Sequence, residues 1–202
     1  MLDTSALACE RGGLRLFSDL ALSVAPGGLL RVRGANGSGK TTLLRALAGL
    51  TRPSAGEVRW RGETIGEEYR KEMLFLGHAP AVKDEMTVQE NLEFSCRLSS
   101  QLISLSKIKG ALEQLGIARL AGLPVRFLSQ GQRRRAALAR LALSPTVPLW
   151  LLDEPFAALD DEAIAQVSGL CAAHLFAGGM LVLTSHQDVS VHAGTLGELD
   201  LG

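Results

Sequence analysis

Short runs of apolar residues, each bounded by glycine or proline, recur along the chain and predict β-strands. They cover residues 20–24, 29–32, 73–76, 149–152 and 180–183. The last three runs are almost unbroken, which is typical of parallel strands that are buried on both faces. Residues 57–61 instead alternate between polar and apolar side chains, as expected of a half-exposed antiparallel strand.

Helical periodicity fills the gaps between these runs. It predicts helices over residues 40–48, 88–98, 107–115, 130–143 and 162–175. Strands and helices alternate near both ends of the chain, whereas the stretch from about residue 84 to 144 contains helices and no good strand. We therefore expect a single α/β unit, with residues 1–83 and 146–202 forming the core and residues 84–145 forming a helical insertion.

The composition is that of a folded protein without a charge bias. Hydrophobic residues make up 47% of the 202 positions, enough to bury a sizeable core. Lys plus Arg and Asp plus Glu both number 21, so the formal net charge is zero. A neutral chain gives no electrostatic reason to bind nucleic acid, and we expect no nucleic-acid partner.

Cysteine usage and hydropathy indicate the compartment. The odd number of widely spaced cysteines, Cys9, Cys96 and Cys171, favours a reducing environment and a cytosolic location. No basic segment followed by an apolar stretch opens the sequence, and no run approaches the roughly 18 apolar residues of a membrane span. We expect neither a signal peptide nor a transmembrane helix.

The most specific feature is the segment GANGSGKT, residues 34–41, which lies between a predicted strand and a predicted helix. Its glycines allow consecutive N–H groups to point into one concavity, and the following helix adds its positive end, so a nucleoside triphosphate is the matching anion. Lys40 would reach the β- and γ-phosphates, and the Thr41 hydroxyl would bind Mg²⁺. The predicted nucleotide-binding residues here are Gly34, Ala35, Asn36, Gly37, Ser38, Gly39, Lys40, Thr41 and Thr42.

Two carboxylates end the buried strand at residues 149–152. Asp153 is expected to hold Mg²⁺, and Glu154 to orient or deprotonate the attacking water. His186 follows another buried strand, which puts it at the ligand edge of a parallel sheet, within reach of a γ-phosphate. The alternative for the acid pair is a solvated junction between strand and loop.

A turn of small residues, LSQGQ at residues 128–132, leads into a helix that begins with three arginines. Ser129 can cap this helix, whose free N–H groups form a second anion site. Two phosphate sites for one nucleotide suggest two subunits. The alternatives for the arginine run are a solvated face or a nucleic-acid patch, and the neutral net charge disfavours the patch.

In order, GANGSGKTT, LSQGQ, LWLLDEP, AALD and His186 resemble the Walker A, signature, Walker B, D-loop and switch-histidine motifs of ABC-type ATPases, over residues 14–186. The resemblance implies a RecA-like P-loop core with an antiparallel β subdomain and a helical subdomain. It implies a head-to-tail dimer in which each ATP lies between the Walker A of one chain and the signature of the other. Roles implied are partner-phosphate contacts for Ser129, Gly131 and Gln132, catalysis for Lys40, Glu154 and His186, and communication across the dimer for Asp160.

Two positions depart from the pattern of this family. Arg11 stands about where an aromatic residue usually stacks on adenine, so base binding is expected to be weaker or less selective. His78 stands where a glutamine usually senses Mg²⁺ and the membrane partner, and it is a candidate metal ligand that protonation would alter.

Within the family, the segments FLGHAPAVKDEMTVQENL, LSQGQRRRAALARL and LWLLDEPFAALD are similar to the ATP-binding subunits of bacterial cytochrome c maturation systems. This implies a peripheral protein on the cytoplasmic face of the inner membrane, bound to integral membrane permease subunits through residues 79–90 and working with a haem chaperone. ATP hydrolysis would power haem export or release of the loaded chaperone. The alternatives are another small-substrate exporter, a soluble ATPase of cluster assembly, or a regulator that does not turn over.

Overall fold

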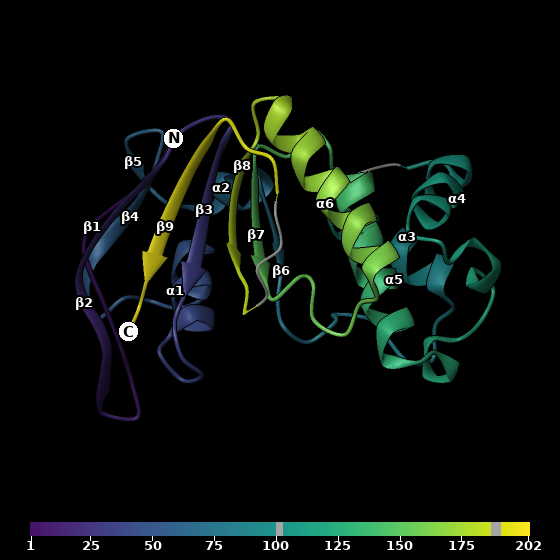
Figure 1. Cartoon of the computed structure of the whole chain (residues 1–202), viewed down its shortest axis with the longest axis horizontal. Coiled ribbons are helices and arrows are strands. Elements are labelled where there is room, and N and C mark those ends of the chain that lie inside the picture. Colours follow the sequence, from purple (N-terminus) through teal and green to yellow (C-terminus); the bar gives the residue numbers. More distant parts are fainter. Residues whose placement is uncertain (100–102, 187–190) are drawn as a thin grey trace.

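A parallel β-sheet forms the centre of the molecule. The computed structural model describes residues 1–99, 103–186 and 191–202. Within these ranges the parallel strands run in the order β6-β7-β8-β3-β9 (Figure 1). Their bounds are β3 Gly28–Arg33, β6 Met73–Leu76, β7 Leu149–Asp153, β8 Met180–Thr184 and β9 Thr195–Asp200.

A second, antiparallel sheet has the strand order β2-β1-β4-β5. Its strands are β1 Leu2–Arg11, β2 Leu14–Val24, β4 Ala55–Trp60 and β5 Glu63–Thr64. The predicted strand at 57–61 corresponds to β4, and the antiparallel pairing expected for it is confirmed. Its alternating pattern, with Val58 and Trp60 buried and Arg59 exposed, is that of a sheet with one face in solvent.

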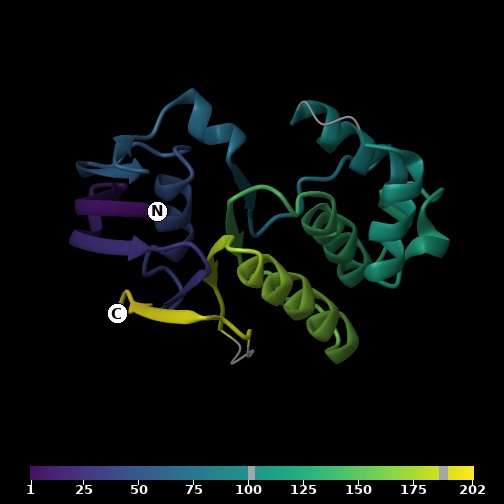
Figure 2. The ribbon, with the colours of Figure 1, turned by 90° about the horizontal axis from the view of Figure 1, so that it is seen from above.

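The helices cover both faces of the parallel sheet. They are α1 Lys40–Leu47, α2 Glu67–Lys71, α3 Val88–Leu98, α4 Leu105–Gln114, α5 Gln130–Leu143 and α6 Asp161–Phe176, with 3-10 turns at Ala118–Leu120 and Val125–Phe127. Helix α1 lies between the two sheets, whereas α5 and α6 lie on the opposite side of the parallel sheet (Figure 1). Seen from above, α3, α4 and α5 form a separate layer far from the antiparallel sheet (Figure 2).

Strand β7 shows why its sequence is apolar throughout. Leu149 and Leu151 face a core shared with α1 and the antiparallel sheet. Trp150 and Leu152 face the other core, which α3, α4, α5 and α6 complete. Because successive side chains of a strand point to opposite faces, burial on both sides requires an unbroken apolar run. The polar residues that follow this strand therefore lie at the edge of the sheet, between the two cores.

The α/β fold class with one parallel and one antiparallel sheet is as predicted, but several elements are new. Strands β1 and β9 and helix α2 were not predicted, and β2 starts six residues before the predicted run at 20–24. These segments are short or carry exposed polar positions, so their periodicity is weak. The division at residues 83 and 146 stays a prediction. No helix in the described ranges is both long and apolar enough to cross a lipid bilayer.

Candidate active site

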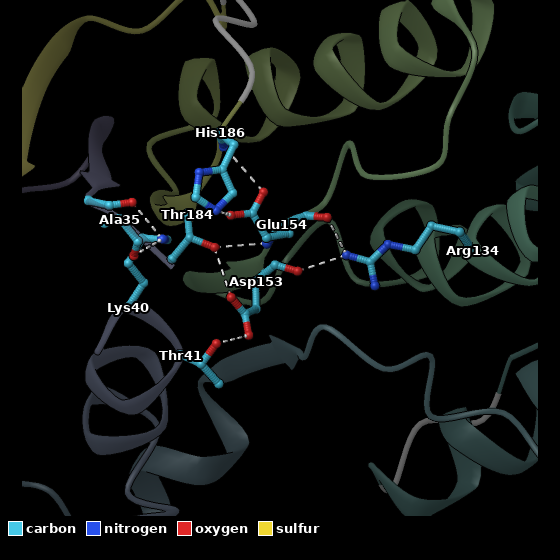
Figure 3. A network of polar contacts seen from close by, with 9 residues as sticks. Ala35, Lys40, Thr41, Arg134, Asp153, Glu154, Thr184 and His186 are labelled. Carbon is cyan, nitrogen blue, oxygen red and sulfur yellow. Dashed lines mark hydrogen bonds and ion pairs between the residues drawn. The ribbon is translucent and has the colours of Figure 1, made fainter. Parts of the chain in front are cut away.

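The glycine-rich loop between β3 and α1 has a backbone that favours glycine. Gly34, Gly37 and Gly39 have φ values of 141°, 87° and 102°, in the region that side chains with a Cβ rarely adopt. A Cβ on Gly34 would lie 2.5 Å from the Ser38 hydroxyl oxygen. Lys40 is buried, and its Nζ donates to the carbonyl oxygens of Gly34 at 2.7 Å and Ala35 at 2.9 Å (Figure 3). The loop is thus curled around its own lysine.

Asp153 ends β7 within hydrogen-bond distance of two threonines. The Thr41 hydroxyl, from the start of α1, donates to Asp153 Oδ2 at 2.8 Å. The Thr184 hydroxyl, from the end of the neighbouring strand β8, donates to Asp153 Oδ1 at 2.8 Å. Asp153 is 1% exposed, and such a buried carboxylate is tolerated because both oxygens accept hydrogen bonds. The sheet register, which pairs Asp153 with Thr184, creates this contact.

Glu154 follows in a strained conformation, with a φ of 50°. Its N–H donates to the Thr184 hydroxyl at 2.8 Å, which fixes the turn. Its carboxylate accepts from the main-chain N–H of His186 at 3.3 Å and lies 3.4 Å from Nε2 of the same residue (Figure 3). The structure therefore brings the predicted acid and the predicted histidine together at the ends of adjacent strands.

These residues surround a single cavity of about 460 Å³. Its lining consists of Arg11, Leu16, Asn36, Gly37, Gly39, Lys40, Thr41, Thr42, His78, Asp153, Glu154, Ala157 and His186. The cavity thus contains the N–H groups of the loop, Lys40 and the N-terminus of α1. It also contains the oxygens of Thr41 and Asp153, which could bind a metal ion, and the carboxylate of Glu154. Such a set can bind a triphosphate and hold a water molecule beside its terminal phosphate.

Ser129, Gly131 and Gln132 lie elsewhere, around a second cavity of about 540 Å³. Ser129 caps α5: its hydroxyl accepts from the Gln132 N–H at 3.3 Å, and the Gln132 side chain accepts from the Ser129 N–H at 3.0 Å. Arg135 and Asp160 form an ion pair in the same cavity, at 2.5 Å. Within the described part of the chain, the two cavities share no lining residue.

The arginine run is not a solvated face, so that alternative is wrong. Arg134 is 4% exposed and donates to main-chain carbonyls at the ends of β6 and β7. Arg133 pairs with Asp84 at 2.8 Å. Arg134 was not predicted as a site residue, although it shares a helix stripe with Ala137, Leu138 and Leu141, all buried. Thr184 was not predicted either, although a polar residue at the end of a buried strand is a signal for a site.

Arg11 and His78 lie at the margin of the nucleotide cavity. Both side chains are exposed, Arg11 at the end of β1 and His78 just after β6. In the ranges that the structure describes, no three His, Cys, Asp or Glu side chains converge in a metal-binding cluster. The oxygen pair of Thr41 and Asp153 still fits Mg²⁺, which takes one or two protein oxygens and completes its shell with phosphate and water.

The fold and this cavity are those of an ATP-binding cassette. A family model described as ABC transporter matches residues 17–157. The chain therefore belongs to the ABC transporter family as an ATP-hydrolysing cassette, and the family and activity inferred from the motifs are confirmed. A solved structure, a dimeric bacterial ABC transporter cassette, superposes with a TM-score of 0.86 at 22% identity, covering 100% of this chain and 95% of that one. At this identity the likeness shows the fold.

Its relatives carry a narrower name. The chain is 47% identical over 205 residues to the cytochrome c biogenesis ATP-binding export protein CcmA of Dechloromonas aromatica (strain RCB), covering 100% of both. It is 49% identical over 193 residues to the protein of the same name in Methylococcus capsulatus, covering 94% of this chain and 93% of that relative. The predicted resemblance to the cytochrome c maturation subfamily is thereby confirmed.

Proposed function

We propose that the residues of the 460 Å³ cavity divide ATP binding and hydrolysis between them. The observation that carries this is the meeting of Lys40, Thr41, Asp153, Glu154 and His186 in one cavity at the carboxyl end of the parallel sheet. The loop N–H groups and Lys40 bind the phosphates, and Lys40 exchanges the carbonyls of Gly34 and Ala35 for phosphate oxygens.

Thr41 and Asp153 would hold Mg²⁺. When bound, this ion would neutralise charge on the phosphate oxygens. The 2.8 Å hydrogen bond between Thr41 and Asp153 keeps both oxygens on one side of the cavity, and Thr184 fixes the remaining carboxylate oxygen. His78 lines the same cavity and is the third candidate ligand, in place of the glutamine usual in the family.

Glu154 acts as the general base, and His186 as the switch residue beside it. One Glu154 oxygen, Oε1, is buried and lies 3.4 Å from His186 Nε2, so it can accept the proton of a water molecule when the histidine turns away. His186, 3.4 Å away, can pair with the carboxylate or turn to the γ-phosphate. Arg11 lines the cavity near Leu16 and supplies a planar guanidinium surface for the base.

The second anion site serves the partner's nucleotide. Ser129, Gly131 and Gln132 line a cavity separate from the phosphate loop, so one chain alone does not bring them to its own ATP. A head-to-tail homodimer would place each signature helix N-terminus against the γ-phosphate held by the other chain. Asp160, paired with Arg135 in that cavity, would then lie at the dimer interface.

The membrane partner is expected to bind at residues 79–90. Ala79, Pro80 and Ala81 line a cavity of about 300 Å³ that reaches Thr41 and Asp153. The loop is held by Asn91, which is 5% exposed. Asn91 accepts from the Lys83 N–H at 2.7 Å and donates to the carbonyls of Lys83, Met86 and Thr87.

The physiological task follows from the relatives, which are named as ATP-binding export proteins of cytochrome c biogenesis. We infer that this chain binds integral membrane permease subunits on the cytoplasmic face of a bacterial inner membrane. Its ATP hydrolysis would power haem export, or release of a haem-loaded chaperone.

The test is purification of the Glu154→Gln chain from native membranes in Mg-ATP, followed by identification of copurifying proteins and an absorption spectrum. Small integral membrane proteins with a haem signal are expected. If other permease subunits copurify without haem, the assignment as a transporter ATPase would stand and the haem assignment would be refuted. Soluble scaffold proteins alone would favour cluster assembly and refute the membrane assignment.

A further inference from the structure

Arg134 lies where a charge is costly. It belongs to α5, is 4% exposed, and shares its helix face with Ala137 and Leu138, which pack into the core. Burial lowers the pKa of its guanidinium, while the nearby carboxylates of Asp153 and Glu154 raise it. A buried cation persists when hydrogen bonds replace its hydration. The partners of Arg134 therefore decide what it does.

Those partners are main-chain carbonyls from two loops. Nη1 donates to the carbonyl of Gly77 at 2.9 Å and to that of His78 at 3.0 Å. Nη2 donates to the carbonyl of Asp153 at 2.8 Å and to that of Glu154 at 2.7 Å, as Figure 3 shows. A planar guanidinium can hold two loops at a fixed distance in this way, because its N–H groups form a rigid fork.

The two loops follow neighbouring parallel strands. The pairing between β6 and β7 ends at Leu76 and Leu152, whereas Asp153 still pairs with Thr184 of β8 on its other side. Buried carbonyls outside the β6–β7 pairing need a donor, and Arg134 supplies one on both sides, together with the Ala157 N–H at the Glu154 carbonyl. One loop begins the proposed docking segment at residues 79–90, and the other carries the proposed metal ligand and base.

Glu154 depends most on this support. Its φ of 50° is unfavourable for a residue with a side chain. Its N–H is held by Thr184 and its carbonyl by Arg134, so the peptide units on both sides of this strained residue are fixed. Without Arg134, the main chain at Glu154 would keep its hydrogen bonds to the Thr184 hydroxyl and, at 3.2 Å, to the Ala157 N–H, but would lose its link to the Gly77 and His78 carbonyls.

We propose that Arg134 is a positioning residue for hydrolysis: its guanidinium joins the Gly77–His78 carbonyls to the Asp153–Glu154 carbonyls and thereby sets the direction of the Glu154 side chain. The inference rests on the proposed role of Glu154 as the base. Arg134 touches neither the phosphates nor the water in this scheme, and it acts through the main chain of Glu154. Its loss should therefore lower kcat and leave ATP binding largely unchanged.

The first experiment compares Arg134→Gln with Arg140→Gln, a matched change six residues further along α5, in the full chain purified with its copurifying membrane proteins. For Arg134→Gln we expect kcat to fall about 10- to 100-fold with KM for ATP within about threefold, since misplacement by about 1 Å can cost on the order of 10²-fold. Arg140→Gln should keep the kcat of the unaltered protein. Equal kcat values for the two variants would overturn the proposal.

A second comparison separates positioning from a loss of structure. In a Glu154→Gln background, adding Arg134→Gln should lower the residual single-turnover rate by less than about threefold, because the group through which Arg134 acts is already absent. The same fold-loss in both backgrounds would indicate a structural role only and refute the proposal. Turnover by Glu154→Gln at the unaltered rate would refute the base assignment instead.

Arg134→Lys covers the case in which Arg134→Gln fails to fold. A lysine keeps the buried cation but offers one nitrogen, which can reach the carbonyls of one loop and not both. We expect an intermediate kcat, about tenfold below that of the unaltered protein, with KM unchanged. A kcat equal to that of the unaltered protein would show that joining the two loops is not needed.

Discussion

Lys40 illustrates how a single residue can keep a binding site assembled before its ligand arrives. Its Nζ donates to two carbonyls of its own loop, at 2.7 and 2.9 Å. Lys40→Ala removes both these hydrogen bonds and the charge that would meet the phosphates. ATP affinity should fall at least tenfold, the equivalent of about 1.4 kcal/mol. Titration with a fluorescent ATP analogue measures this affinity. An unchanged affinity in Lys40→Ala would show that Lys40 does not bind the phosphates.

Glu154→Gln should separate binding from turnover. The amide keeps the shape of the side chain but cannot accept the proton of the attacking water, so kcat should fall about 10²- to 10⁴-fold while ATP still binds and the closed dimer accumulates. Phosphate release and size-exclusion chromatography in Mg-ATP measure the two effects. Glu113→Gln, on the exposed side of α4, is the control and should behave as the unaltered protein. Unchanged turnover by Glu154→Gln would contradict the role of base.

Thr184 is predicted to stabilise the whole edge of the sheet. Its buried hydroxyl donates to Asp153 and accepts from the Glu154 N–H. Thr184→Val keeps the shape and leaves a buried carboxylate oxygen and an N–H without their partner, which should lower the free energy of unfolding by about 1 to 3 kcal/mol. Urea denaturation measures the change. A loss below about 0.5 kcal/mol would mean that water replaces the hydroxyl.

At the scale of residues, the sequence predicted the side chains that would contact the nucleotide better than the residues that hold those side chains in place. The loop, Asp153, Glu154 and His186 were predicted because each has a characteristic residue type directly after a strand. Thr184 and Arg134 act through main-chain and second-neighbour contacts that depend on strand register and on the angle of α5. One sequence alone does not specify that angle.

At the scale of elements, α6 is attached to the sheet through an unusual pair. His174 stacks on Trp150 of β7, with ring centroids 3.9 Å apart and planes 3° apart. One ring nitrogen, Nε2, lies 3.2 Å from the Met180 carbonyl at the start of β8. Burial lowers the pKa of His174 below its usual 6.5, so the folded protein holds this ring neutral.

This burial predicts a pH-dependent stability. Because the unfolded chain binds the His174 proton more readily, the contribution of the neutral ring is full above about pH 6.5 and is lost as pH falls through the lowered pKa. The free energy of unfolding should therefore be lower at pH 5.5 than at pH 7.5 in urea titrations. His174→Phe keeps the stacking and should show a smaller difference. An equal difference in both proteins would assign the effect to other groups.

Elements with strong periodicity were predictable from sequence, and edge elements were not. α3 and α5 were predicted with their observed bounds, since each has a capping box at its N-terminus and an apolar stripe. β9 has exposed side chains at alternate positions and pairs along one side with β3. Its apolar content is too low for a strand to be predicted from the sequence, and its extended conformation depends on pairing with β3.

For the whole molecule, the main prediction concerns two chains. If each ATP lies between the phosphate loop of one chain and Ser129 of the other, a mixture of Lys40→Ala and Ser129→Asp chains forms some dimers with one intact site. Aspartate keeps the helix cap but repels the phosphate. We expect phosphate release from the mixture and much less from either variant alone.

A mixture of Lys40→Ala and Glu154→Gln provides the matched control. Both changes lie in the same cavity of a single chain, so every mixed dimer has two defective sites and should stay inactive. Recovery in this control, or none in the first mixture, would contradict the head-to-tail arrangement.

Asn91 gives the proposed docking loop an unusual mechanical character. One side chain makes hydrogen bonds to Lys83, Met86 and Thr87, so the loop and the start of α3 are cross-linked at several points. A load applied by a membrane subunit at this loop would therefore not be absorbed by bending of the loop. The load would instead displace α3 as a rigid body. A movement of a few ångströms in the membrane subunit would then produce a movement of similar size in this chain.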